Sequence, residues 1–197
     1  MPELGDYQDK RREFFKAYFT KALKYQEYLA TGEQVHQQRW DEHYQAVGLS
    51  NEQQKLVQSF VRRQNVLFMS GIWCGDCVRQ GPIVQRIAEA NDLIDLRFID
   101  NKENPDLAEE LRLNGAYKVP VAVFLSEDFF ELGRFGDRHL AIYRATLTSE
   151  LGPACSTGLT VPDRDVLGQD LLDWLDLVER TQAMLRLAPL LRQRYGD

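Results

Sequence analysis

Two cysteines three residues apart, Cys74 and Cys77, are the side chains of this sequence best suited to chemistry. At the start of a helix, residues with this spacing lie on one face, at a separation that suits a disulfide. The helix N-terminus also presents unpaired backbone N–H groups and a positive dipole end, which favour thiolate over thiol. Because the thiolate is the species that attacks a disulfide, the pair predicts reversible dithiol–disulfide exchange.

The elements around the pair are expected to place it at such a helix start. A short apolar run at 66–69 predicts a strand buried on both faces, and Gly71 ends it. A helix is expected over 74–90, with Pro82 inside it. The order of the later elements predicts an α/β fold with a central mixed sheet flanked by helices. We expect these elements to be strands over 93–99, 119–125 and 131–135, and helices over 104–113 and 138–150.

Further helices are expected on both sides of this unit. Apolar spacing predicts one helix over 9–29, and two more over 33–46 and 50–63, the last with a capping box between Ser50 and Gln53. C-terminal to the α/β unit we expect a loop, and after it a long helix that Pro189 bends or ends. We therefore divide the chain into an N-terminal helical extension (1–49), an α/β domain (50–151), and a loop with a C-terminal helix packed on that domain (152–197).

The segment around the cysteines resembles the thioredoxin family, whose Trp-Cys-Gly-Pro-Cys site opens a helix after a central strand. Trp73, Cys74, Gly75 and Cys77 stand in the matching places. The helix of that family carries a kinking proline eight residues after the first cysteine, and Pro82 stands there. The resemblance covers about residues 50–150 and implies a thioredoxin-like fold.

The resemblance also implies a function and roles for individual residues. The family places a cis-proline after a β-branched residue at the start of a later strand, and Val119 and Pro120 match this pair. The implied activity is that of a thiol–disulfide oxidoreductase, with Cys74 as the nucleophile and Cys77 as the resolving thiol. A substrate-binding role is implied for the residues around the cysteines, which are Trp73, Gly75, Asp76, Val119 and Pro120.

Two residues depart from the family pattern. Asp76 replaces the proline between the cysteines, and its negative charge should raise the pKa of Cys74. We therefore expect that pKa to stay near the value of a free cysteine, and the pair to act as a reductant. Phe68 stands where the family buries an aspartate that moves a proton at the resolving thiol, so Asp76, a water molecule or the substrate would have to replace it.

Composition argues against several other classes of protein. The formal net charge is −6 over 197 residues, whereas nucleic-acid binders usually present a basic face. No apolar stretch approaches the roughly 20 residues that span a bilayer. The polar first ten residues lack the apolar core of a signal peptide, which favours the cytoplasm. Neither nucleic acid nor membrane is expected as a partner.

Other interpretations of the cysteines are less favoured. A zinc site needs four ligands, whereas Cys155 is alone in an expected loop and the histidines His36, His43 and His139 show no ligand spacing to it. We expect neither metal nor cofactor. The expected partners are disulfide-containing proteins or small molecules, together with a reductase or small thiol that restores the dithiol. The alternative function is a protein-binding module or a redox sensor with little turnover.

Overall fold

The computed structural model describes residues 7–151 and 165–196. Along the chain its elements are α1 (Arg12–Lys21), α2 (Tyr25–Ala30), α3 (Gln34–Ala46), α4 (Asn51–Gln58), β1 (Gln64–Ser70), α5 (Gly75–Glu89), β2 (Ile94–Asp100), α6 (Pro105–Glu110), β3 (Val121–Leu125), β4 (Glu131–Gly136), α7 (Leu140–Leu151), α8 (Val166–Leu187) and α9 (Pro189–Tyr195). The expected strands and most expected helices are therefore present.

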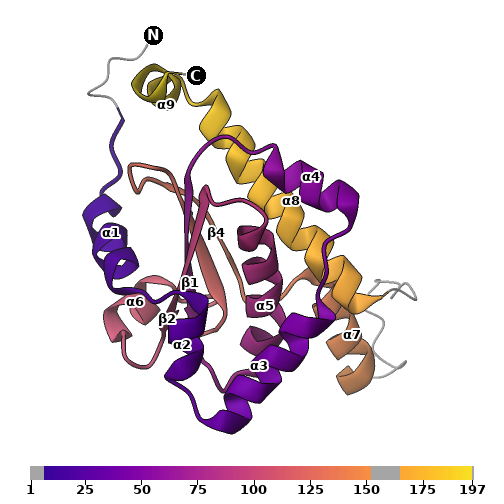
Figure 1. Ribbon diagram of the computed structural model, residues 1–197. Coiled ribbons are helices and arrows are strands. Elements are labelled where there is room, and N and C mark those ends of the chain that lie inside the picture. Colours follow the sequence, from indigo (N-terminus) through magenta and orange to yellow (C-terminus); the bar gives the residue numbers. More distant parts are fainter. Residues whose placement is uncertain (1–6, 152–164, 197) are drawn as a thin grey trace.

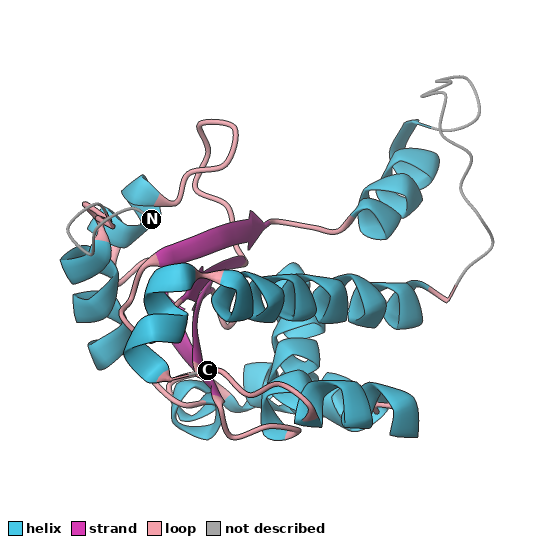
Figure 2. Cartoon of the chain, turned by 90° about the horizontal axis from the view of Figure 1, so that it is seen from above, coloured by secondary structure: helices cyan, strands magenta, loops and turns pink. Residues whose placement is uncertain are grey.

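The strands form one mixed sheet in the order β2-β1-β3-β4. β1 pairs with β2 in parallel, while β3 pairs with both β1 and β4 in antiparallel fashion. Figure 1 shows α1 and α6 on one side of the sheet and α3, α5 and α8 on the other. Seen from above in Figure 2, helices surround the strands. The predicted α/β fold, with its mixed sheet, added N-terminal helices and long C-terminal helix, is confirmed.

β1 is the central strand that leads to the cysteines. Every residue from Gln64 to Ser70 is buried, as expected of a strand covered on both faces. Gly71 follows, and α5 begins at Gly75 after a short turn. The strand and the sheet around it therefore fix the start of the helix that carries Cys77.

The single helix predicted over 9–29 is wrong, because the chain leaves the helix between α1 and α2. At this break the Leu23 N–H donates to the Phe98 carbonyl at 2.8 Å, and the Phe98 N–H donates to the Leu23 carbonyl at 2.7 Å. Phe98 belongs to β2, the edge strand, whose free backbone groups need partners. Pairing with the sheet edge thus outweighs continuation of the helix at this residue.

Two other helix ends have identifiable causes. The Ser50–Gln53 capping box is confirmed, but α4 ends at Gln58 rather than near residue 63. The Asn91 side-chain amide donates to the carbonyl of Val57 in the last turn at 2.8 Å and to that of Phe60, just beyond the end, at 2.9 Å. At the C-terminus, Pro189 starts α9 after α8 has ended, so the expected interruption of the long helix is confirmed.

The N-terminal helices share the main core with the sheet. Phe98 lies at the centre of an aromatic group, with the Tyr28 ring stacked at 5.5 Å and the Tyr25 and Trp40 rings edge-on at 5.5 and 6.0 Å. These aromatic side chains are all buried. The extension is therefore part of the same hydrophobic cluster as β1 and α5.

Trp40 connects this cluster to the turn before the cysteines. It is fully buried, and its indole N–H donates to the Ile72 carbonyl at 2.9 Å. The ring lies directly against Gly81 of α5, where an added Cβ would meet Trp40 Cζ3 at 2.2 Å. A larger residue at Gly81 would push α3 away from α5 or displace the indole.

We predict that Gly81→Ala lowers the free energy of unfolding by about 1–3 kcal/mol, because the methyl group overpacks this contact. The sign of the change in the free energy of unfolding is the test, because alanine in an ordinary helix interior is more favourable than glycine by about 1 kcal/mol. Gly48→Ala is the matched control, because a Cβ there would meet no atom within 4 Å. Urea unfolding of both variants measures the difference; a Gly81→Ala protein as stable as the wild type would contradict the packing.

Candidate active site

The two cysteines lie at the junction of β1 and α5. Cys74 is the N-cap of α5, with an extended backbone, and Cys77 lies in the first turn. The Cys74 N–H donates to the Gly71 carbonyl at 2.8 Å, which closes the turn between strand and helix. Both cysteines are free thiols. The predicted placement of the pair at the start of a helix is therefore confirmed.

Cys77 is the buried member of the pair. Its side chain is fully buried, and its sulfur accepts a hydrogen bond from the Gly71 N–H at 3.4 Å. Burial raises the pKa of Cys77 well above the ordinary value, and the neighbouring Cys74 sulfur raises it further. The Ser70 hydroxyl and the Gly71 N–H act in the opposite direction. Cys77 is therefore a thiol at neutral pH.

Cys74 is only partly buried and has the opposite character. The pKa of Cys74 falls to about 6, chiefly because the Cys77 thiol donates a hydrogen bond to the Cys74 sulfur. The backbone N–H groups of Cys77 and Asp76 also lower the pKa, and together these donors outweigh the effect of burial. The expectation of a pKa near that of a free cysteine is thus wrong, and the argument from that pKa for a reductant falls with it. Cys74 is largely a thiolate at neutral pH.

Asp76 raises the pKa of Cys74 as expected, but as the smallest of the named causes. Its carboxylate is held by two arginines, with Arg79 Nη2 at 2.7 Å from Oδ1 and Arg138 Nε at 2.7 Å from Oδ2. The positive charges of the two arginines weaken the electrostatic effect of the Asp76 carboxylate on the Cys74 sulfur. Arg79 lies one helical turn after Asp76, so the sequence spacing is compatible with an ion pair between the two. Arg138 comes from the segment before α7, and no local spacing indicates its ion pair with Asp76.

Arg79 also reaches a buried carboxylate on the C-terminal helix. Its Nε lies 3.3 Å from Oδ2 of Asp170 in α8. Asp170 is fully buried, and burial raises its pKa to about 6. The chain Asp76–Arg79–Asp170 therefore ties the residue between the cysteines to α8, a connection that no sequence pattern indicated.

The Val119–Pro120 pair lies beside Cys74. Its peptide bond is cis, as the resemblance implies, and both residues are buried. The Cys74 sulfur lies 3.7 Å from the Val119 carbonyl oxygen. Trp73 on the other flank is 44% exposed, and the Lys102 ammonium lies 4.6 Å from its ring centre. The predicted site residues are thus gathered at one place, with Gly75 exposed at the helix start.

At the position of the family's buried aspartate, Phe68 packs in the core. Its ring lies 5.2 Å from that of Phe98 and 6.0 Å from that of Trp174. The polar neighbour of Cys77 is instead Ser70, the last residue of β1, whose hydroxyl is fully buried. Sequence reasoning missed Ser70, because nothing in a strand sequence shows which residue faces the second cysteine.

The described residues offer neither a metal site nor a membrane span. Among them, no group of three or more His, Cys, Asp or Glu side chains could hold a metal ion. None of the helices in that part of the chain has both the length and the apolarity of a membrane span. Cys155 lies outside the described residues. His139 is buried and stacked on Phe135 at 4.1 Å.

Comparison with known proteins adds an independent line of evidence. A family model described as Thioredoxin matches residues 22–147. A curated relative, putative thioredoxin 2 of Streptomyces coelicolor, is 29% identical over 82 residues, which cover 42% of this chain and 56% of the relative. The match therefore spans just over half the length of that relative. The match to the family model begins at residue 22, within the N-terminal helical extension (1–49).

Solved structures share the fold over more of the chain. A protein of unknown function from Pseudomonas aeruginosa has a TM-score of 0.65 at 22% identity, covering 83% of this chain and 95% of that one. An HIV epitope scaffold also has a TM-score of 0.65, at 21% identity, covering 84% of this chain and 98% of its own. At these identities the likeness concerns the fold.

The ion pairs of Asp76 predict opposite effects of two substitutions on the pKa of Cys74. Asp76→Asn removes a negative charge near the sulfur, so the pKa should fall below that of the wild type. Arg138→Gln leaves Asp76 less compensated and removes a cation, so the pKa should rise. The measurement is thiolate absorbance against pH in the reduced proteins.

Arg194→Gln is the matched control, because it breaks an arginine–aspartate pair in α9 that does not involve the cysteines. In Arg194→Gln the pKa of Cys74 should equal that of the wild type. A rise in Asp76→Asn, or a fall in Arg138→Gln, would show that Asp76 does not act on the thiolate in this way.

Proposed function

This chain belongs to the thioredoxin family, and from that premise we propose that it is a thiol–disulfide oxidoreductase that works through Cys74 and Cys77. The proposed direction is reduction of disulfides in proteins or small molecules. The activity of the relatives is carried over to this chain as part of the proposal, since the curated match covers just over half of the relative.

The observation that carries the proposal is the contrast between the two thiols. Cys74 is accessible and has a pKa of about 6, whereas Cys77 is buried and has a raised pKa. A low pKa supplies the attacking thiolate, and burial keeps the second thiol in reserve until the first has reacted. An inert buried pair would not combine an accessible thiolate with an adjacent protonated thiol.

The reaction proceeds in two exchanges that balance in atoms and electrons. The Cys74 thiolate attacks one sulfur of the substrate, the substrate S–S bond breaks, and one half leaves as a thiolate. Cys77 then loses its proton to a departing thiolate and attacks Cys74 Sγ, which forms the Cys74–Cys77 disulfide and releases the other half. The substrate gains two electrons and the protein loses two.

The surroundings of Cys74 suit this exchange. The Val119 carbonyl stands beside the sulfur, so an extended substrate segment next to Val119 and Pro120 would bring its disulfide to Cys74. Trp73, Gly75 and Asp76 border the same sulfur along the chain. Within this proposal they are the substrate-contacting surface.

Continued turnover requires an external reductant. The Cys74–Cys77 disulfide returns to the dithiol when a reductase or a small thiol donates two electrons, so no resident cofactor takes part in the exchange. A reducing compartment such as the cytoplasm suits this cycle, and we propose that location for the protein.

The proposal predicts different outcomes for the two cysteine variants. Cys74→Ser should abolish reduction of a disulfide substrate such as insulin in the presence of dithiothreitol, because the nucleophile is gone. Cys77→Ser should lose turnover yet accumulate mixed disulfides through Cys74, because the resolving thiol is gone. Turnover and mass spectrometry of trapped adducts are the measurements.

Cys155→Ser is the control for the remaining thiol and should turn over like the wild type. Normal turnover in Cys74→Ser would remove the proposed nucleophile. A wild-type protein that does not accelerate reduction at all would favour the alternative of a binding module or sensor.

A further inference from the structure

A pocket of about 500 Å³ lies next to the proposed active site, on the side of Trp73. Its walls come from the N-terminal helices, the turn before Cys74, and the end of β2 with the segment after it. The residues that line it include Lys21, Tyr28, Trp73, Asp100, Lys102 and Glu103. Val119 and Pro120 are not among the residues that line it. The pocket is therefore separate from the Val119–Pro120 surface.

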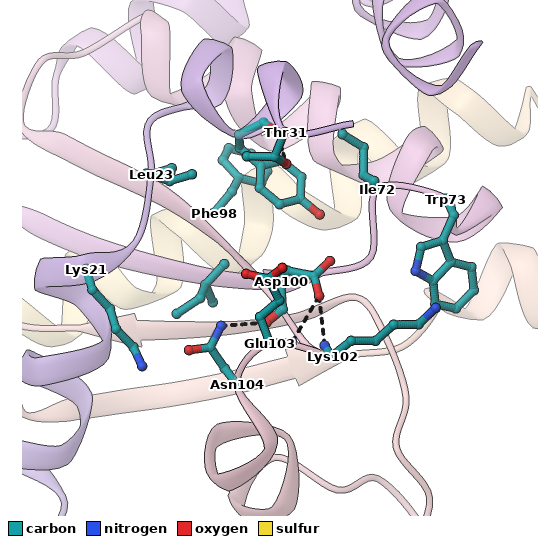
Figure 3. A pocket seen from close by; sticks show the side chains of 12 residues that line it. Lys21, Leu23, Thr31, Ile72, Trp73, Phe98, Asp100, Lys102, Glu103 and Asn104 are labelled. Carbon is teal, nitrogen blue, oxygen red and sulfur yellow. Dashed lines mark hydrogen bonds between the residues drawn. The ribbon is translucent and has the colours of Figure 1, made fainter. Parts of the chain in front are cut away.

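Two lysines of the pocket have no carboxylate partner among the described residues. The Lys21 ammonium lies 4.0 Å from the ring centre of Tyr18, and that of Lys102 lies 4.6 Å from the ring centre of Trp73. Figure 3 shows the Lys102 side chain extended toward Trp73, with Lys21 on the other side of Asp100. Both charges are thus available to carboxylates of a ligand.

The floor of the pocket holds a buried tyrosine hydroxyl. Tyr28 is 1% exposed and lines the pocket, and the Ser70 hydroxyl at the end of β1 is the hydrogen-bond partner of its hydroxyl. A polar ligand group that reaches the Tyr28 hydroxyl would add a hydrogen bond in a site of low dielectric constant.

The pocket also carries negative charge. Asp100 Oδ1 accepts hydrogen bonds from the N–H groups of Lys102 and Glu103 at 2.8 and 3.3 Å, and the Glu103 carboxylate stands beside it. Cationic and anionic groups therefore line the same cavity. A ligand that carries both carboxylates and an ammonium group matches this pattern better than a purely anionic one.

We propose that this pocket binds one half of a small zwitterionic peptide disulfide and presents its sulfur to Cys74. The inference rests on the proposed oxidoreductase function and names a substrate class for it. Trp73 lines the pocket and directly precedes Cys74 in the chain, so this residue connects the pocket to the cysteine pair. The volume lies in the range of about 300–1,000 Å³ typical of small-molecule sites. The exchange follows the two steps given above, with the small thiol as product.

The test compares two small disulfides that share the chemistry but differ in charge. Prereduced protein is mixed with glutathione disulfide or with uncharged 2-hydroxyethyl disulfide, without other reductant, and the rate constant for protein oxidation is measured for each. The ratio of the two rate constants isolates the contribution of the pocket. In Lys21→Met/Lys102→Met the ratio should fall roughly threefold to tenfold, as expected for loss of two partly exposed ion pairs.

Lys55→Met is the matched control, since Lys55 is an exposed lysine of α4 that does not line the pocket. It should leave the ratio within about twofold of the wild type. Tyr28→Phe should lower the ratio, because it removes the hydroxyl and keeps the ring. High salt should lower the wild-type ratio as well, because it screens exposed charges.

A second readout does not depend on the cysteines. S-methylglutathione carries the same charged groups as one half of the disulfide but cannot exchange, and its binding should shift the NMR signal of the Trp73 indole N–H. The shift should weaken in Lys21→Met/Lys102→Met and persist in Cys74→Ser.

The outcomes separate the two proposals. If neither disulfide oxidises the wild type, the oxidoreductase function fails and this inference with it. If both react but the ratio is unchanged in Lys21→Met/Lys102→Met, and S-methylglutathione gives no shift, the pocket assignment is overturned while the function stands. An equal loss of insulin reduction in the same variant would assign the pocket to protein substrates and overturn the inference.

Discussion

The backbone of one residue, Gly71, holds both cysteines. Its carbonyl accepts the Cys74 N–H at 2.8 Å, and its N–H donates to the Cys77 sulfur at 3.4 Å. A Cβ at this position would lie 2.9 Å from the Trp73 indole, so only glycine fits the turn without displacing that ring. The relative positions of Trp73, Cys74 and Cys77 depend on this turn at the end of β1. The turn places Cys77 in the interior and Cys74 at the helix start, where the burial of Cys77 and the hydrogen bond from its thiol to the Cys74 sulfur separate the two pKa values.

The N-terminal helices support the same turn from outside. Trp40 donates to the Ile72 carbonyl at 2.9 Å, and Gly32 lies so close to Ile72 that a Cβ would meet its side chain at 2.4 Å. The extension also supplies Lys21 and Tyr28 to the pocket beside Trp73. These helices therefore act on the site in two ways, by fixing the turn and by forming the wall of the neighbouring cavity.

Local features of the sequence predicted much of the fold and of the site. An uninterrupted apolar run identified β1, and the cysteine spacing identified the start of α5, because both depend on neighbours in the chain. Features that depend on distant partners were missed. The helix break at Leu23 arises from pairing with Phe98, and the low pKa of Cys74 persists beside Asp76 partly because Arg138 lies against that carboxylate. Neither partner is indicated by spacing or composition.

The central claim is that the pKa values of two neighbouring thiols are shifted in opposite directions, by the burial of Cys77 and by its hydrogen bond to the Cys74 sulfur. The most direct test is a pH titration of the reduced protein in which the Cβ atoms of the cysteines are labelled with ¹³C and followed by NMR. The account predicts that the Cys74 signal titrates near pH 6 while Cys77 remains a thiol well above pH 9. Titration of both cysteines together near the free-cysteine value of about 8.5 would contradict it.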